Sequence, residues 1–172
     1  NLGWQVSEIG LGCWAIGSEW GDVSKNDARE VLKTSLDQGI NFFDTADVYG
    51  DGRSEKFVGE LIKSTSEKIY VATKSGRRLN PHTAQGYNIK NIESFIDRSL
   101  INLGIECIDL LQLHCPPSEI CPKKETYEMM DEIVKKGKIA NYGVSVEKVS
   151  EAIDAIQFSN LKSIQIIFNI FR

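Results

Sequence analysis

Short apolar runs alternate with longer amphipathic segments along the whole chain. The apolar runs have the length and composition of buried strands, and they lie at 6–14, 40–46, 68–74, 107–114, 139–145 and 163–170. Between them, apolar residues recur every three or four positions, which is the spacing of a helix with one buried face. The pattern therefore predicts six strands with a helix between each pair of neighbours.

The helical stripes identify residues expected in the core. The first stripe follows Ser24, whose hydroxyl can cap a helix start, and consists of Ala28, Val31, Leu32 and Leu36. The last stripe lies within 146–156 and consists of Val149, Ile153 and Ile156. We expect both sets to face the sheet.

Regular alternation of strand and helix predicts an α/β fold, either an open doubly wound sheet or a parallel barrel. The loop "GLGCWAIG" after the first strand does not complete the G-x-G-x-x-G fingerprint of a dinucleotide-binding sheet. Reactive side chains at successive strand ends favour the (β/α)8 TIM barrel. Such a barrel typically needs about 250 residues, so we interpret residues 1–172 as a single barrel domain that supplies the first six strands and is C-terminally incomplete.

The composition limits the kinds of binding partner that we expect. With 41% apolar and 26% charged residues and a net charge of −4, the chain resembles an ordinary soluble domain, and it lacks the basic clusters of a nucleic-acid partner. No run approaches the roughly 20 apolar residues of a membrane span, and the start lacks the features of a signal peptide, so we expect a cytoplasmic protein. The four cysteines match no common zinc spacing, and we expect no metal site. The oligomeric state is not indicated.

Ionisable side chains follow three consecutive predicted strands. Asp44 ends the second strand with Tyr49 in its loop, Lys74 ends the third, and His114 ends the fourth. Because the carboxyl ends of parallel strands share one rim, we expect the four groups to converge. Each of the four residues taken singly could have a structural role and no catalytic one. For His114 considered alone, the structural role is favoured. The full set favours a catalytic site.

These groups suit the reduction of a carbonyl. Tyr49 would protonate the developing alkoxide, and the Lys74 ammonium would lower the tyrosine pKa from its usual value of about 10. Asp44 would hold Lys74 in its charged form, and His114 would donate a hydrogen bond to the substrate oxygen. We therefore expect a small carbonyl compound as the substrate.

The residues that carry this chemistry resemble the aldo-keto reductase family, whose members are (β/α)8 barrels that reduce aldehydes and ketones with a nicotinamide cofactor. The stretches "GLGCWAIG", "INFFDTADVYG", "ATK", "LINLGIECIDLLQLH" and "GKIANYGVS" look like the family's successive signatures, in order and at similar spacing. The catalytic Asp, Tyr, Lys and His of the family match Asp44, Tyr49, Lys74 and His114.

The resemblance implies that NADP(H) is the cofactor and that Ser145 and Gln165 bind its carboxamide, with Asn169 nearby. Taken alone, Ser145 could be a helix cap and Gln165 a buried amide. Trp14 and Trp20 fall in the loop that lines the substrate pocket in relatives, although either could be packing only. Many relatives have Asn after the strand-five serine, where this chain has Val146.

In the family, strands seven and eight carry the groups that stack on the nicotinamide and hold the cofactor phosphates, and residues 1–172 contain none of those positions. We expect the segment to be part of a longer NADPH-dependent reductase. Three alternatives stay open. One is a cofactor-binding or redox-sensing module that resembles the potassium-channel β-subunits, another is an inactive fragment, and the third is an unrelated barrel whose strand ends match by accident.

Overall fold

The computed structural model describes residues 2–17 and 21–171. Six parallel strands form one sheet in the order β1-β2-β3-β4-β5-β6. The strands are β1 Leu11–Gly12, β2 Phe42–Asp44, β3 Tyr70–Ser75, β4 Ile108–His114, β5 Ile139–Val146 and β6 Ser163–Ile166. The helices between them are α1 Lys25–Asp37, α2 Arg53–Ser64, α3 Ile89–Leu103, α4 Lys124–Lys135 and α5 Val149–Ala155.

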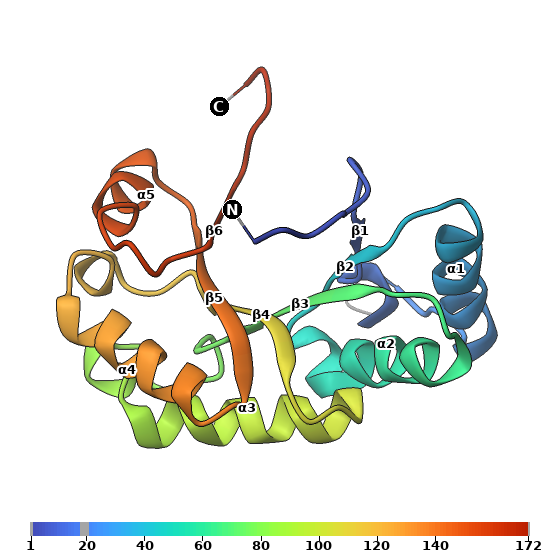
Figure 1. Cartoon of the computed structure of the whole chain (residues 1–172), viewed down its shortest axis with the longest axis horizontal. Helices are drawn as coiled ribbons and strands as arrows, with labels where there is room; N and C mark the ends of the chain where they lie inside the picture. The colour runs from blue at the N-terminus through green and yellow to red at the C-terminus, as the bar shows by residue number, and fades with distance from the viewer. Residues whose placement is uncertain (1, 18–20, 172) are drawn as a thin grey trace.

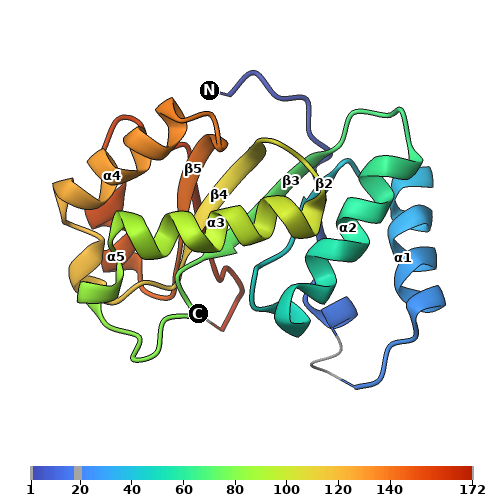
Figure 2. The same ribbon diagram turned by 90° about the horizontal axis from the view of Figure 1, so that it is seen from below.

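The sheet curves into an arc with its helices on the convex side. Figure 1 shows the strands along the inside of the arc and the helices around its outside, and the same helices cover the outer face in Figure 2. A doubly wound sheet carries helices on both faces, whereas a (β/α)8 barrel carries them only outside. The barrel prediction is confirmed, and the chain forms six of the eight strands of such a barrel.

Strand register divides the sheet into two chemically different faces. On the convex face, Phe43 pairs in register with Val71, and both are buried beneath the helices. Side chains alternate along a strand, so the next residue of each strand faces the other way. The concave face therefore receives the polar residues that we predicted at the strand ends.

The helical stripes are confirmed at the start of the chain and wrong at its end. Ala28, Leu32 and Leu36 of α1 are buried, although Val31 is 44% exposed. In α5 the expected stripe of Val149, Ile153 and Ile156 is exposed, and the helix instead turns Ala152 and Ala155 toward the core. The buried face of α5 therefore includes small alanines, which the hydrophobic pattern alone did not indicate.

The first and last strands are shorter than predicted. β1 has two residues within the expected 6–14, and β6 has four within 163–170. Both are edge strands of the six-stranded sheet and are paired on one side only, so fewer ladder hydrogen bonds define them. Within the part of the chain that the structure describes, no helix is long and apolar enough to cross a membrane.

Candidate active site

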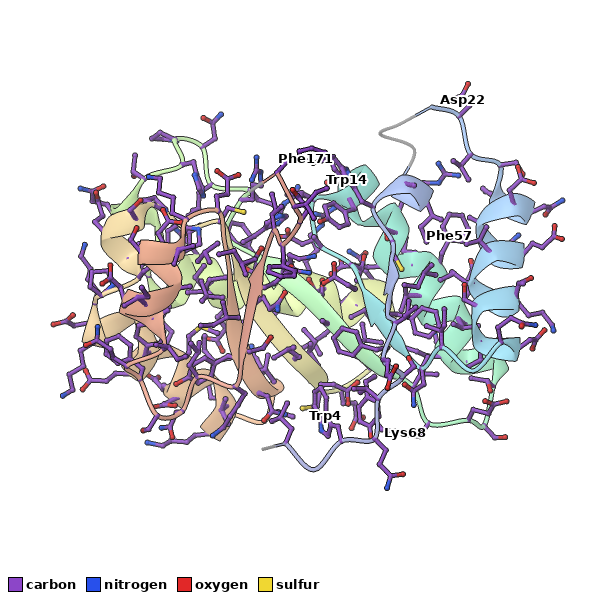
Figure 3. The ribbon with its side chains drawn as sticks, turned by 90° about the horizontal axis from the view of Figure 1, so that it is seen from above. Trp4, Trp14, Asp22, Phe57, Lys68 and Phe171 are labelled. Atoms are coloured by element: carbon purple, nitrogen blue, oxygen red, sulfur yellow. The ribbon has the colours of Figure 1, made fainter. Side chains whose placement is uncertain are left out.

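A cavity of about 780 Å³ lies at the carboxyl ends of the strands, and we call it the rim cavity. It is lined by side chains that include Trp14, Asp44, Tyr49, Lys74, His114, Ser145 and Gln165. Figure 3 looks onto the concave side of the sheet, with Trp14 near the end that carries the cavity and Trp4 and Lys68 near the opposite end. The convergence expected from the strand ends is thus present in the geometry.

Strand register accounts for this arrangement. His114 of β4 is paired with Ser145 of β5, which is paired in turn with Gln165 of β6. Lys74 is in register with Gln112, two residues before His114, so all of these side chains emerge on the concave face. The apolar convex face thereby determines which residues the rim receives.

Lys74 is the most deeply buried charge of the site, with 2% of its side chain exposed. Its Nζ donates to Oδ2 of Asp44 at 2.7 Å and to the carbonyl oxygen of Thr45 at 2.9 Å. A third contact joins Nζ to the Tyr49 hydroxyl at 3.4 Å. A buried ammonium is stable only when it is paired, so Asp44 and the Thr45 carbonyl hold it where it faces the tyrosine.

Tyr49 lies in the 3₁₀ turn Tyr49–Gly52 that follows β2, and a close backbone contact fixes this turn. Gly50 has a φ of +56°, and a Cβ there would fall 2.3 Å from the Gly17 carbonyl oxygen, so a larger residue is excluded. Asp51 accepts from Arg78 Nη1 at 2.7 Å and from Arg98 Nη2 at 2.8 Å. The loop is therefore tied to the loop after β1 and to α3.

The electrostatics of Tyr49 differ from the sequence-based expectation. Lys74 does favour the phenolate, but burial outweighs it, and the net effect is to raise the tyrosine pKa above its usual value. The phenol therefore stays protonated at neutral pH. The Lys74 ammonium lies 5.0 Å from the ring centroid, close enough to stabilise a phenolate once the proton has left.

His114 ends β4 with 6% of its surface exposed, and its ring meets the Tyr49 ring edge-on at 5.9 Å. Burial, together with the positive charges of Lys74 and Arg77, lowers the pKa of His114 to about 3. The imidazole is thus neutral, and its Nδ1 is buried with no hydrogen-bond partner among the residues that the structure describes. A neutral ring in this position can donate one N–H to an oxygen in the cavity.

The predicted carboxamide-binding residues divide into two groups. Ser145 and Gln165 lie side by side in the rim cavity, and the Gln165 amide makes no hydrogen bond within the described residues. Asn169 lies apart from them, because its side chain is exposed and accepts a hydrogen bond from the Phe171 backbone N–H at 2.9 Å. The structure therefore does not bring Asn169 to the site.

The two candidate pocket tryptophans also differ. Trp14 lines the rim cavity, and its ring is stacked on that of Tyr49 with centroids 6.0 Å apart. Trp20 lies outside the described residues. Trp14 thus forms an apolar wall next to the tyrosine hydroxyl.

Sequence reasoning missed two contributors to the site. One is the Thr45 carbonyl, which a residue pattern cannot reveal because any residue carries one. The other is Arg77, which lines the cavity from the loop after β3. Its position three residues after Lys74, in a strand-end loop, was the available signal.

Comparison with known proteins relates this chain to one family. The model of the Aldo/keto reductase family matches residues 8–172. The aldo-keto reductase YhdN of Bacillus subtilis is 36% identical over 175 residues, and the aldo-keto reductase yakc [NADP(+)] of Schizosaccharomyces pombe is 35% identical over 146 residues. These alignments cover 99% and 81% of this chain, and 53% and 42% of the two relatives.

Solved structures agree with the sequence comparison. The holo form of an aldo-keto reductase from Bacillus halodurans superimposes with a TM-score of 0.81 and 33% identity, covering 95% of this chain and 54% of the other. A glycerol dehydrogenase from Gluconobacter oxydans gives a TM-score of 0.80 and 31% identity, with 97% and 53% covered. The chain therefore spans about half the length of these relatives. With the family model matched along nearly its whole length, the chain belongs to the aldo/keto reductase family.

Proposed function

We propose that the protein that contains this chain reduces aldehydes or ketones to alcohols and uses NADPH as the hydride donor. The observation that carries the proposal is the contact between Lys74 Nζ and the Tyr49 hydroxyl at 3.4 Å, beside His114 in one cavity. The S. pombe relative is named for NADP+, which supports NADP(H) over NAD(H).

Tyr49 acts as the general acid in this proposal. A carbonyl oxygen becomes an alkoxide when hydride reaches the carbon, and an alkoxide is basic enough to take a proton even from a phenol with a raised pKa. The phenolate left behind faces the Lys74 ammonium, whose position depends on Asp44. The negative charge that forms on Tyr49 during the reaction is thus stabilised by the Lys74 ammonium, which is already in place.

His114 orients the substrate oxygen. Its neutral imidazole can donate a hydrogen bond without competing with Tyr49 as an acid, because a pKa of about 3 leaves it uncharged across the physiological range. Two donors then converge on one oxygen, the Tyr49 hydroxyl and the histidine N–H. Trp14 limits the approach of water from one side.

The residues present fit the nicotinamide end of the cofactor. The Gln165 amide, which makes no hydrogen bond within 2–17 and 21–171, and the hydroxyl of Ser145 offer donors and acceptors at neighbouring positions, as a carboxamide requires. When bound, NADPH would supply the hydride. Ser145 and Gln165 would hold the carboxamide in the cavity that Tyr49 also lines.

The test follows NADPH absorbance with a reactive aromatic aldehyde, using the full-length protein. We expect Tyr49→Phe to lower kcat at least about 100-fold, because it removes the proton donor, and to leave NADPH binding by fluorescence unchanged. Tyr70→Phe is the matched control, since Tyr70 begins β3 at the opposite end of the sheet and stacks on Trp4.

Full activity in Tyr49→Phe would refute the proposed acid. NADPH binding without turnover of any carbonyl compound by the wild-type protein would refute the proposed reductase and favour a cofactor-binding module.

A further inference from the structure

Among the described residues, Lys74, Arg77 and Arg78 are basic side chains at or beside the rim cavity, and they differ in their pairing. Lys74 is paired with Asp44, and Arg78 is paired with Asp51 at 2.7 Å. Arg77 lines the cavity, yet it makes no hydrogen bond or ion pair with any residue in 2–17 or 21–171. The cavity thus contains a guanidinium whose charge the described protein does not neutralise.

The loop that carries Arg77 is held firmly on both sides. Gly76 has a φ of +112°, and a Cβ there would fall 2.7 Å from the Tyr87 ring, so the chain makes a turn that only glycine permits. Leu79 N–H donates to the Gly76 carbonyl at 3.1 Å, which closes the turn. Arg78 contacts Asp51 and also donates to the Asp47 carbonyl oxygen at 3.3 Å. Arg77 is therefore presented to the cavity by a fixed backbone.

Arg77 lies within electrostatic range of the proposed site. Its charge contributes to the lowered pKa of His114, which lines the same cavity. A second charged group, Glu147, lines the cavity from the loop after β5, two strands away. It forms no ion pair with Arg77 in the part of the chain described. The cavity therefore has a positive side at β3 and a negative side at β5.

A guanidinium in this position suits an anionic ligand group. Arginine binds carboxylate and phosphate through two parallel N–H donors, and such charge-assisted bonds are stronger than neutral ones. Arg77 is exposed at the mouth of the cavity, so its guanidinium is open to a ligand that enters, and Trp14 and Val48 line the same cavity. Glu147 would repel an acidic group and so direct it toward Arg77.

We propose that Arg77 binds an anionic group, a carboxylate or a phosphate, on the carbonyl substrate, so that acidic aldehydes and ketones are preferred over neutral ones of similar size. The inference rests on the proposed carbonyl reduction. It assigns to Arg77 the selection and orientation of the substrate, and leaves proton transfer to Tyr49.

The test compares matched substrates in the full-length protein with saturating NADPH. One pair is para-carboxybenzaldehyde against para-methylbenzaldehyde, and the other is glyceraldehyde 3-phosphate against glyceraldehyde. The variants are Arg77→Met, which removes the charge, and Arg77→Lys, which keeps the charge without the planar fork. Arg29→Met is the control, because it removes the same charge at a site on α1, where Arg29 pairs with Glu60.

We expect the wild-type protein to prefer the acidic member of at least one pair by about tenfold in kcat/KM. Arg77→Met should abolish that preference, mainly through KM, while it changes kcat/KM for the neutral member less than about twofold. Arg77→Lys should restore part of the preference, and added salt should weaken it. The pair with the larger loss identifies carboxylate or phosphate as the group bound.

Two outcomes overturn the inference. Equal losses on acidic and neutral substrates in Arg77→Met would mean that the residue only supports the loop, and a wild-type protein without acidic preference would mean that Arg77 does not select substrates. Both are distinct from failure of the proposed function, in which no carbonyl compound is reduced at all.

Discussion

The Asp44–Lys74 pair allows a quantitative test of how the site is held together. At the observed 2.7 Å, Coulomb's law with an effective dielectric constant of about 20 gives roughly 6 kcal/mol of gross attraction. Desolvation of both groups offsets much of this attraction, since Lys74 is 2% and Asp44 18% exposed. Removing one partner, however, leaves the other charge buried and alone, which typically costs about 3–5 kcal/mol.

The perturbation is a double-mutant cycle of Asp44→Asn and Lys74→Met. We expect Asp44→Asn to lower the free energy of unfolding by about 3 kcal/mol, at the low end because the Thr45 carbonyl oxygen still accepts a hydrogen bond from the ammonium. Lys74→Met should cost about 2 kcal/mol, since the more exposed carboxylate recruits water more easily. The double variant contains no unpaired charge and should lose only about 2 kcal/mol, so that the coupling energy is about 3 kcal/mol.

Urea unfolding of the full-length protein, followed by tryptophan fluorescence, measures each free energy. The control cycle uses Lys33→Met and Asp37→Asn, an exposed ion pair on α1 for which we expect a coupling below about 0.5 kcal/mol. Additive losses at Asp44 and Lys74 would refute the reasoning, because they would mean that the two charges do not depend on each other.

Two further predictions concern pH and packing. Because the pKa of His114 is lowered to about 3, kcat/KM should show no step from histidine titration between about pH 5 and 8. Because the pKa of Tyr49 is raised above its usual value of about 10, kcat/KM should fall only as the pH rises through that pKa and the proposed acid loses its proton. A step near pH 6.5 would contradict this assignment of a neutral His114. Gly59→Ala should destabilise the protein by about 2 kcal/mol in urea, despite the helix propensity of alanine, because its Cβ would lie 2.4 Å from the Leu103 carbonyl oxygen. Lys56→Ala on the exposed face of the same helix should be nearly neutral.

The fold could be predicted because its main signal is local. Short apolar runs identify the strands, and Asp44, Lys74 and His114 lie at or near their carboxyl ends. Because a helix connects each strand to the next and the strands are parallel, these ends meet at one rim. The face of a short helix was harder to predict. In α5 the large apolar residues are exposed and Ala155 is buried, so the most hydrophobic residues do not mark the buried face of this helix.

The electrostatics of the site could not be predicted from residue types. The sequence identified Lys74 as a neighbour of Tyr49, but the balance between its charge and the burial of the phenol depends on three-dimensional packing. Arg77 and Arg78 are adjacent and identical in sequence, and only the structure distinguishes the one paired with Asp51 from the one left facing the cavity. Which charged residues form an ion pair depends on the fold, so a local sequence motif does not show it.

The register of the sheet links folding to the proposed chemistry. A one-residue slip of β3 would turn Lys74 toward the helices, where no carboxylate of the concave face could reach it, and would turn Val71 out of the core. The first change would separate the Lys74 ammonium from Asp44, and the second would forfeit the burial of a valine, worth about 1.5–3 kcal/mol. Both penalties oppose the same slip. The apolar face that stabilises the sheet therefore also keeps Lys74 beside Asp44, and the position of the proposed proton-transfer groups is fixed before any substrate binds.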